Sequence, residues 1–451
     1  MKDLFKSIVS EDKHSEMYKI VRDEKHHLPV KMMILDAFST FEDIDGNFVE
    51  QFQTTGFDAR LFELYVWMCL KESGFNIDRS HKYPDFIINK GNKKAAIEVT
   101  IATGGLTTDE KLYIGDYEND PISKRDINSE EFQHYIKNDV PLMFSSSILS
   151  KLQKKYWENE HCKGIPFVIG VGGFFDDVAS MYTCGSLLSI LFGIEHAYDR
   201  HGLPYGKFID SHDKSGVKIP SGLFYMPTEE WEDMKYVSAI AFSNGGTISK
   251  FNRMGWYKGY YDSYDMVLRT GMRVNRKGPE PINFAYFLSK ADKKEKWNDE
   301  VIIIHNPCAL RPLPKKLFKD YSSVFFDKNG ILQLSVPKSS LGIMGSFTST
   351  VCATDIEIDE KDVVKITKAE FDRFRKRPRS TFGAIEVNWF KSLNEENVGV
   401  LYMTPGDSEC FFFYKIFLKC RRDIYRCGIV SGRFDDENDA VREMVEGLQV
   451  L

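Results

Sequence analysis

Two acidic residues in the first quarter of the chain have a spacing that suits a metal site. Asp85 opens a short apolar run, and Glu98 lies within a second run that follows the turn residues 90–92. We predict that these runs are adjacent strands, because Lys-Gly-Asn is turn chemistry. Alternation along the second strand places Glu98 and Thr100 on one face. A carboxylate on such an apolar strand needs a cation or a donor beside it, and two carboxylates at neighbouring strand ends suit Mg²⁺.

Further elements must surround these strands if they are to form a site. Apolar residues recur at three- and four-residue steps from Phe57 to Ser73, and Gly74 follows as a stop, which predicts a helix. The sequence around the acids predicts strands at 75–77, 86–88 and 95–101, a helix at 145–157 and a strand at 166–172. Beyond these, it predicts a helix at 181–192 and strands at 237–242 and 301–305. The order is helix, strands, helix, strand, which is typical of an α/β domain.

The segment Pro84-Asp85 followed by Glu98-Val99-Thr100 resembles the motif of the PD-(D/E)XK nuclease superfamily. The resemblance implies a restriction-endonuclease-like core, an α/β fold with a mixed central sheet flanked by helices. It implies that Asp85 and Glu98 bind Mg²⁺, with Mn²⁺ as a substitute, and that Glu63 on the preceding helix adds a third acid. The implied reaction is hydrolysis of DNA phosphodiester bonds, with RNA the less expected substrate. Defence against foreign DNA is a role that the superfamily often has.

The motif departs from the superfamily at Thr100, which stands where a lysine is expected. In that superfamily a nearby helix sometimes supplies the lysine, and the predicted helix 145–157 carries Lys151, Lys154 and Lys155. Lys151 and Lys155 share a helix face, so we expect one of these two to complete the site and leave the choice open. Lys154 points further round the helix and is a candidate for contact with nucleic acid.

Other basic residues are candidates for phosphate contacts. Arg60 lies one turn before Glu63 and is placed either to reach a phosphate or to pair with that acid. Lys250 and Arg253 follow a predicted strand and are taken as nucleic-acid contacts. The ordinary alternatives are that Glu63 lies on a solvated helix face, which is about as expected as a metal role, and that the lysines of 145–157 are plain surface charges.

Longer segments resemble a bacterial protein family to which no function is attached. The resemblance runs from about residue 30 to the C-terminus and rests on residues 45–52, 56–65, 250–255 and 305–309. Past the proline-rich segment 311–314 the pattern changes to strands at 381–387, 398–404, 410–418 and 425–430 and a helix at 436–448. We therefore predict four parts: a helical extension at 1–56, the nuclease-like domain at 57–310, a connecting segment at 311–380 and an α+β accessory domain at 381–451.

Composition limits the remaining classes of function. The 451 residues are 42% apolar with a net charge of −6, so the chain can build cores but is not uniformly basic. The eight cysteines form no CxxC pair, and no long apolar run is present, which predicts a cytoplasmic protein without membrane contact. The rival prediction is a nuclease-like module that has lost catalysis and binds nucleic acid or a protein partner. A homodimer is also left open.

Overall fold

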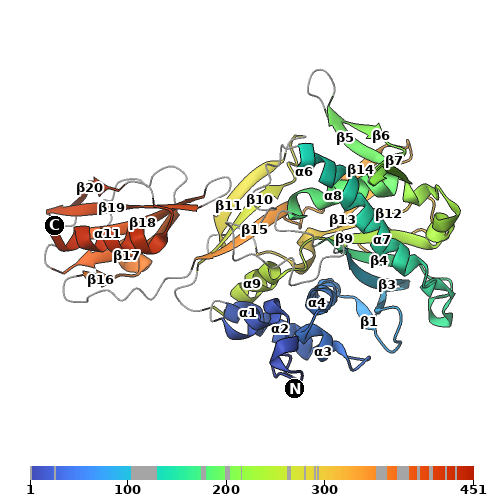
Figure 1. Ribbon diagram of the computed structural model, residues 1–451, viewed down its shortest axis with the longest axis horizontal. Coiled ribbons are helices and arrows are strands. Elements are labelled where there is room, and N and C mark those ends of the chain that lie inside the picture. The colour runs from blue at the N-terminus through green and yellow to red at the C-terminus, as the bar shows by residue number, and fades with distance from the viewer. Residues whose placement is uncertain are drawn as a thin grey trace. The chain divides into compact units, whose positions relative to one another are not determined.

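The computed structural model describes residues 3–450 except 25–26, 103–129, 174–178, 199–203, 215, 262–265, 279–280, 289–290, 292–293, 352–362, 373–384, 394–396, 406–409, 422–423 and 432–433. The chain divides into two compact units (Figure 1): unit 1 takes in residues 1–262 and 266–350, and unit 2 takes in residues 263–265 and 351–451. Unit 1 thus includes residues 1–56, predicted as an extension, and part of the predicted connecting segment 311–380.

Unit 1 is built on an eight-stranded mixed sheet with the strand order β1-β2-β3-β4-β9-β12-β13-β14. The strands are β1 (Asn76–Asp78), β2 (Phe86–Lys90), β3 (Lys93–Ala102), β4 (Phe167–Gly173), β9 (Val237–Ser243), β12 (Val301–His305), β13 (Ser322–Phe326) and β14 (Leu332–Ser335). β3 pairs in parallel with β4, and β4 with β9, whereas β1, β2 and β3 form an antiparallel meander. The predicted α/β class with a mixed central sheet is confirmed.

Helices cover both faces of this sheet (Figure 1). One face carries α4 (Phe57–Glu72) with α1 (Glu16–Asp23), α2 (Leu28–Ser39), α3 (Phe48–Gln53) and α9 (Ile248–Tyr257); the other carries α7 (Val140–Leu152) and α8 (Ala179–Phe192). The alternation of β3 fits this layering. Ile97 and Val99 pack in the core under α4, while Ala96 and Ala102 pack in the core under α7. Glu98 therefore faces the α7 layer.

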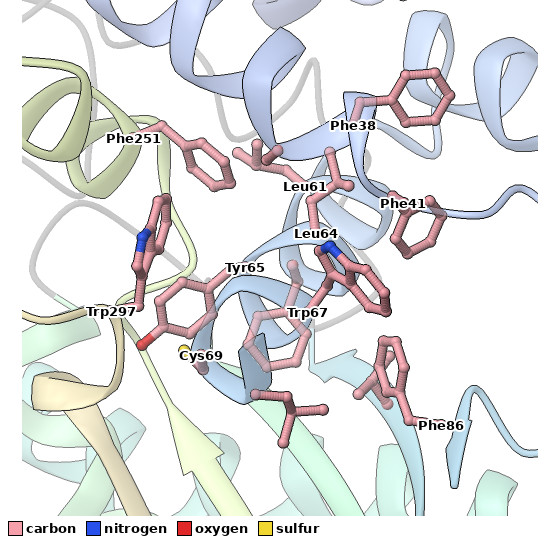
Figure 2. Packing of buried hydrophobic residues seen from close by; sticks show 14 of the residues in the cluster. Phe38, Phe41, Leu61, Leu64, Tyr65, Trp67, Cys69, Phe86, Phe251 and Trp297 are labelled. Carbon is pink, nitrogen blue, oxygen red and sulfur yellow. The ribbon is translucent and has the colours of Figure 1, made fainter. Parts of the chain in front are cut away.

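The core under α4 is rich in aromatic residues (Figure 2). The Tyr65 ring of α4 lies 6.2 Å from the Trp297 ring, which in turn lies 5.1 Å from the Phe251 ring of α9. On the other side of α4, Trp67 contacts Phe41 and Phe86. Because these rings bury large apolar areas, they fix α4 and the N-terminal helices on the strands that carry the acids.

Smaller elements complete unit 1. A three-stranded sheet contains β10 (Met266–Arg273), β11 (Ile282–Phe287) and β15 (Ile343–Val351); two hairpins contain β5 (Ile194–Tyr198) with β6 (Pro204–Phe208) and β7 (Ser211–Lys214) with β8 (Val217–Pro220). The remaining helix is α6 (Glu130–His134). No helix in the described part of the chain is both long enough and apolar enough to cross a membrane.

Unit 2 is an antiparallel meander with helices. It contains β16 (Val363–Lys365), β17 (Ile385–Ser392), β18 (Val398–Pro405), β19 (Cys410–Arg421), β20 (Ile424–Val430), α10 (Lys368–Asp372) and α11 (Glu437–Val450). Four of these strands and α11 match predicted elements, although residues 381–384 lie outside the described chain. A Cβ on Gly399 would lie 2.8 Å from Leu448 Cδ1, so the glycine lets α11 pack closely on β18.

Candidate active site at the end of the β2–β3 hairpin

Glu98 is the centre of the candidate site, and its side chain is only 3% exposed. Its Oε1 accepts a hydrogen bond of 2.7 Å from the Lys151 ammonium, and its Oε2 accepts one of 3.2 Å from the Asp85 backbone N–H. A carboxylate at this depth has a high desolvation cost without such partners. The Lys151 ammonium and the Asp85 N–H are therefore the donors that stabilise this carboxylate.

Asp85, which lies just before β2, is hydrogen-bonded to β3, the strand that carries Glu98. Its Oδ2 accepts a hydrogen bond of 2.7 Å from the Val99 N–H, so the two acids each bind the backbone beside the other. Burial raises the pKa of Asp85 well above its ordinary value, and the Glu98 and Glu63 carboxylates raise it further. The acids therefore share one electrostatic environment.

Lys151 rather than Lys155 is the lysine that reaches the acids. Helix α7 spans Val140–Leu152, not the predicted 145–157, so Lys151 lies in its last turn. Lys155 lies beyond the helix in a left-handed conformation (φ 48°) and pairs with Asp233 at 3.0 Å. Lys154 is exposed, as predicted for a surface residue, and Thr100 is partly buried on the Glu98 face of β3. Of the two lysines left open by the sequence, Lys151 is the one that contacts Glu98.

Glu63 is buried near Asp85 but is occupied by two arginines. Arg60 Nη1 lies 2.5 Å from Glu63 Oε2, and Arg79 Nη2 lies 2.9 Å from Oε1. Arg60 also donates to Gln51 Oε1, which makes it a structural partner of α3. The expected role of Glu63 as a third metal ligand does not fit this arrangement, because a cation would have to displace both guanidinium groups. Arg79 was not predicted, and its position after a short strand carries no signal in the sequence.

Tyr156 and Cys162 form the wall beside Glu98, and neither was predicted. Burial raises the pKa of the Tyr156 phenol, and the neighbouring Glu98 charge adds to it. The same two causes, in the same order, raise the pKa of the Cys162 thiol to about 11. Both side chains are thus neutral at physiological pH and keep the surroundings of Glu98 at low polarity.

The prediction that Lys250 and Arg253 bind nucleic acid is wrong, because both side chains are buried in unit 1. Lys250 Nζ lies 2.5 Å from Glu295 Oε1, and Arg253 bridges Glu295 and Glu300 at 2.7 and 3.0 Å. Arg269 pairs with the same two acids. We call these five residues the buried ion cluster. Its acids lie more than forty residues along the chain from Lys250 and Arg253, so local sequence could not reveal it.

Of the acids predicted as metal ligands, Asp85 and Glu98 are the two that would hold a hard divalent cation, because Glu63 is paired with arginines. Within the described ranges, no group of three or more His, Cys, Asp or Glu side chains is arranged to hold a metal ion. Two carboxylates are nevertheless sufficient for Mg²⁺, which usually keeps several waters and takes one or two protein carboxylates together with substrate phosphates. Burial first, and then the Glu98 and Glu63 charges, raise the pKa of Asp85, and a bound cation would oppose that rise.

The environment of Asp85 makes a prediction for stability without added metal. Its pKa is higher folded than unfolded, so the folded state holds more protons and stability falls as pH rises from about 3.9 upward. We expect Asp85→Asn to be more stable than the wild type at pH 8, with a smaller gain at pH 5. Thermal unfolding in a chelator at both pH values measures this. Asp233→Asn, at the surface pair with Lys155, is the control; a gain that is independent of pH would contradict the assignment.

Comparison with protein-family models, with curated proteins and with solved structures found no match to this chain.

Proposed function

We propose that the chain is a divalent-metal-dependent nuclease whose active site is formed by Asp85, Glu98 and Lys151. The observation that carries this proposal is the Lys151 ammonium at 2.7 Å from Glu98 Oε1. The nuclease motif lacks its lysine at Thr100, and Lys151 reaches the same acid from the helix that follows the hairpin. The proposal therefore does not require a lysine at position 100.

The arrangement of elements gives independent support. α4, β1, β2, β3, α7 and β4 follow one another in the order that the resemblance to the PD-(D/E)XK superfamily implies, with an antiparallel meander joined in parallel to β4. We infer that this part of unit 1 is a restriction-endonuclease-like core. The remaining strands of the sheet and unit 2 are additions to it.

Each site residue has a chemical task in phosphodiester hydrolysis. Mg²⁺, when bound, supplies Lewis-acid stabilisation of the phosphate and lowers the pKa of a water. Asp85 and Glu98 would hold the cation, and their carboxylates accept hydrogen bonds from backbone N–H groups and from Lys151. The Lys151 ammonium has three donors and offers the remaining ones to the attacking water or a phosphate oxygen. Arg60 and Arg79 neutralise Glu63, so the site does not repel an anionic substrate.

A cleavage assay tests the proposal. Labelled single- and double-stranded DNA, and RNA of the same sequence, are incubated with the full chain in Mg²⁺, in Mn²⁺ and in a chelator. We expect metal-dependent cleavage that is lost in Asp85→Asn and in Glu98→Gln and kept in Asp233→Asn. DNA is the expected substrate, and a role in defence against foreign DNA is part of the proposal.

Two results would reject the assignment. Cleavage that persists in both acid variants would come from another site or another protein. Binding of nucleic acid without cleavage, unchanged by metal, would instead identify a non-catalytic binding module on a nuclease-like scaffold. A homodimer or a protein partner would then be the next question, and sedimentation of the full chain answers it.

A further inference from the structure

An aromatic surface adjoins the proposed active site and has no part in the chemistry described above. It consists of His81 and Tyr83, in the loop between β1 and β2, and of Tyr156 and His161, in the segment after α7. The imidazole rings of His81 and His161 are stacked at 3.8 Å with an interplanar angle of 2°, and the Tyr83 and Tyr156 rings lie 6.0 Å apart. We call these four residues the aromatic platform.

The platform is fixed in place by contacts outside the rings. His161 Nε2 lies 2.6 Å from the Tyr83 carbonyl oxygen, which ties the two segments together. At the start of the loop, the Ser80 N–H donates to Asp78 Oδ1 at 2.8 Å, and the Arg79 guanidinium lies 3.7 Å above the Phe41 ring. A surface that is rigid before binding loses little conformational entropy when it takes a ligand.

Tyr83 is the residue through which the platform meets solvent. It is 49% exposed. Only one residue separates it from Asp85, so their Cα atoms lie at most about 7 Å apart. Tyr156, on the inner side of the platform, lies beside Glu98. The aromatic surface is thus continuous with the acids.

Charges of both signs lie around the platform. Lys82 has a side chain that is 60% exposed, and its Nζ lies 5.6 Å from the Tyr83 ring centroid and 4.0 Å from an Asp45 oxygen. Lys154 is exposed at the end of α7. Asp78 lies on the histidine side, where its pKa is lowered by its hydrogen bonds to Ser80 first and by His81 and His161 after that. Lys82 therefore places a positive charge beside the exposed tyrosine, while the segment that carries Tyr156 and His161 also exposes the acids Glu158 and Glu160.

We propose that the aromatic platform binds single-stranded nucleic acid, with an unpaired base stacked on Tyr83 and the adjoining phosphate directed toward the proposed active site. This inference rests on the proposed nuclease function and adds its substrate class. Base stacking on an aromatic side chain contributes about 1–3 kcal/mol per base and tolerates any sequence. In a duplex both faces of an internal base are already covered by its neighbours, so the platform selects a single strand or an unpaired end.

Equilibrium binding of fluorescently labelled DNA tests the platform without cleavage. The full chain in a chelator is titrated into a short single strand and into the blunt duplex of the same sequence, with anisotropy as the readout. We expect tighter binding of the single strand. Tyr83→Ala should weaken it by about 5- to 100-fold, whereas Tyr83→Phe, which keeps the ring, should bind within about twofold of the wild type. Tyr225→Ala, at another exposed tyrosine, is the matched control.

The outcomes separate the platform from the catalytic proposal. Equal single-strand affinity in Tyr83→Ala and the wild type overturns the platform, and so does equal loss of single-strand and duplex binding. If Tyr83→Ala alone loses single-strand affinity while no nucleic acid is ever cut, the binding surface stands and hydrolysis fails. If cleavage depends on Asp85 but Tyr83→Ala binds normally, hydrolysis stands and the platform fails. A thermal midpoint matching the wild type establishes that Tyr83→Ala is folded.

Discussion

Lys151→Met is expected to reduce metal-dependent cleavage by about 100-fold or more. Removing one donor that stabilises developing charge commonly lowers turnover by about 10²–10³. Lys151 donates to Glu98 at 2.7 Å and is the lysine that this acid contacts. The methionine keeps most of the apolar stem, which limits any loss of packing in the last turn of α7. Single-turnover rates at saturating nucleic acid measure the effect on the chemical step.

The neighbouring lysines provide matched controls for Lys151. Lys154→Met removes an exposed charge from the same segment, and Lys155→Met removes the partner of Asp233. We expect turnover within about threefold of the wild type in both, because exposed ion pairs contribute little, although Lys154→Met should weaken binding at low salt. An equal loss in all three variants would indicate general electrostatic attraction and would remove Lys151 from the proposed active site.

Glu295→Gln is expected to lower the free energy of unfolding of unit 1 by about 3–5 kcal/mol. Glu295 accepts contacts from Lys250, Arg253 and Arg269, all of them buried in the ion cluster. The amide would leave these three cations with Glu300 as their remaining acid. Such uncompensated charge in a dry interior costs far more than the loss of a surface pair. Urea unfolding followed by tryptophan fluorescence measures the difference, with Trp297 close to the cluster.

The pH dependence of this effect has a definite sign. Burial opposes ionisation of Glu295, but Arg253, Arg269 and Lys250 outweigh it and hold its pKa well below the ordinary value. Its contribution is therefore complete above the unfolded pKa of glutamate, about 4.3, and is lost only as pH falls through the lower folded value. The wild type and Glu295→Gln should differ as much at pH 5.5 as at pH 7. Glu232→Gln, in the surface pair with Lys235, should change stability by under about 0.5 kcal/mol.

The sequence predicted the hairpin and its acids because the signals there are local. The turn at 90–92, the alternation of β3 and the position of Asp85 before β2 all depend on neighbours in the chain. Neighbouring residues could not show which of Lys151 and Lys155 reaches Glu98, because both fit the same face of the predicted helix. The answer depended on where α7 ends, and the left-handed conformation of Lys155 has no marker such as glycine or asparagine.

The failures have a shared physical reason. Lys250 and Arg253 have the residue types of a phosphate-binding surface, and only the distant Glu295 and Glu300 turn them into interior residues. Likewise Glu63 lies on α4 where a metal ligand was expected. Its carboxylate instead pairs with Arg60 and with Arg79, which follows β1. Long-range pairing of charges is decided by tertiary packing, which a single sequence does not display.

The position of β4 in the sheet limits how far the protein can be shortened. A fragment from α4 to β4 would contain Asp85, Glu98 and Lys151, but in the intact sheet β4 pairs with β3 on one side and β9 on the other. All seven residues of β4 are buried. Truncation before β9 would therefore leave a wholly apolar edge strand with unpaired N–H and C=O groups, which is a template for aggregation. The later strands thus cover the edge of β4 and keep the half of the sheet that carries Asp85 and Glu98 from pairing with other copies of itself.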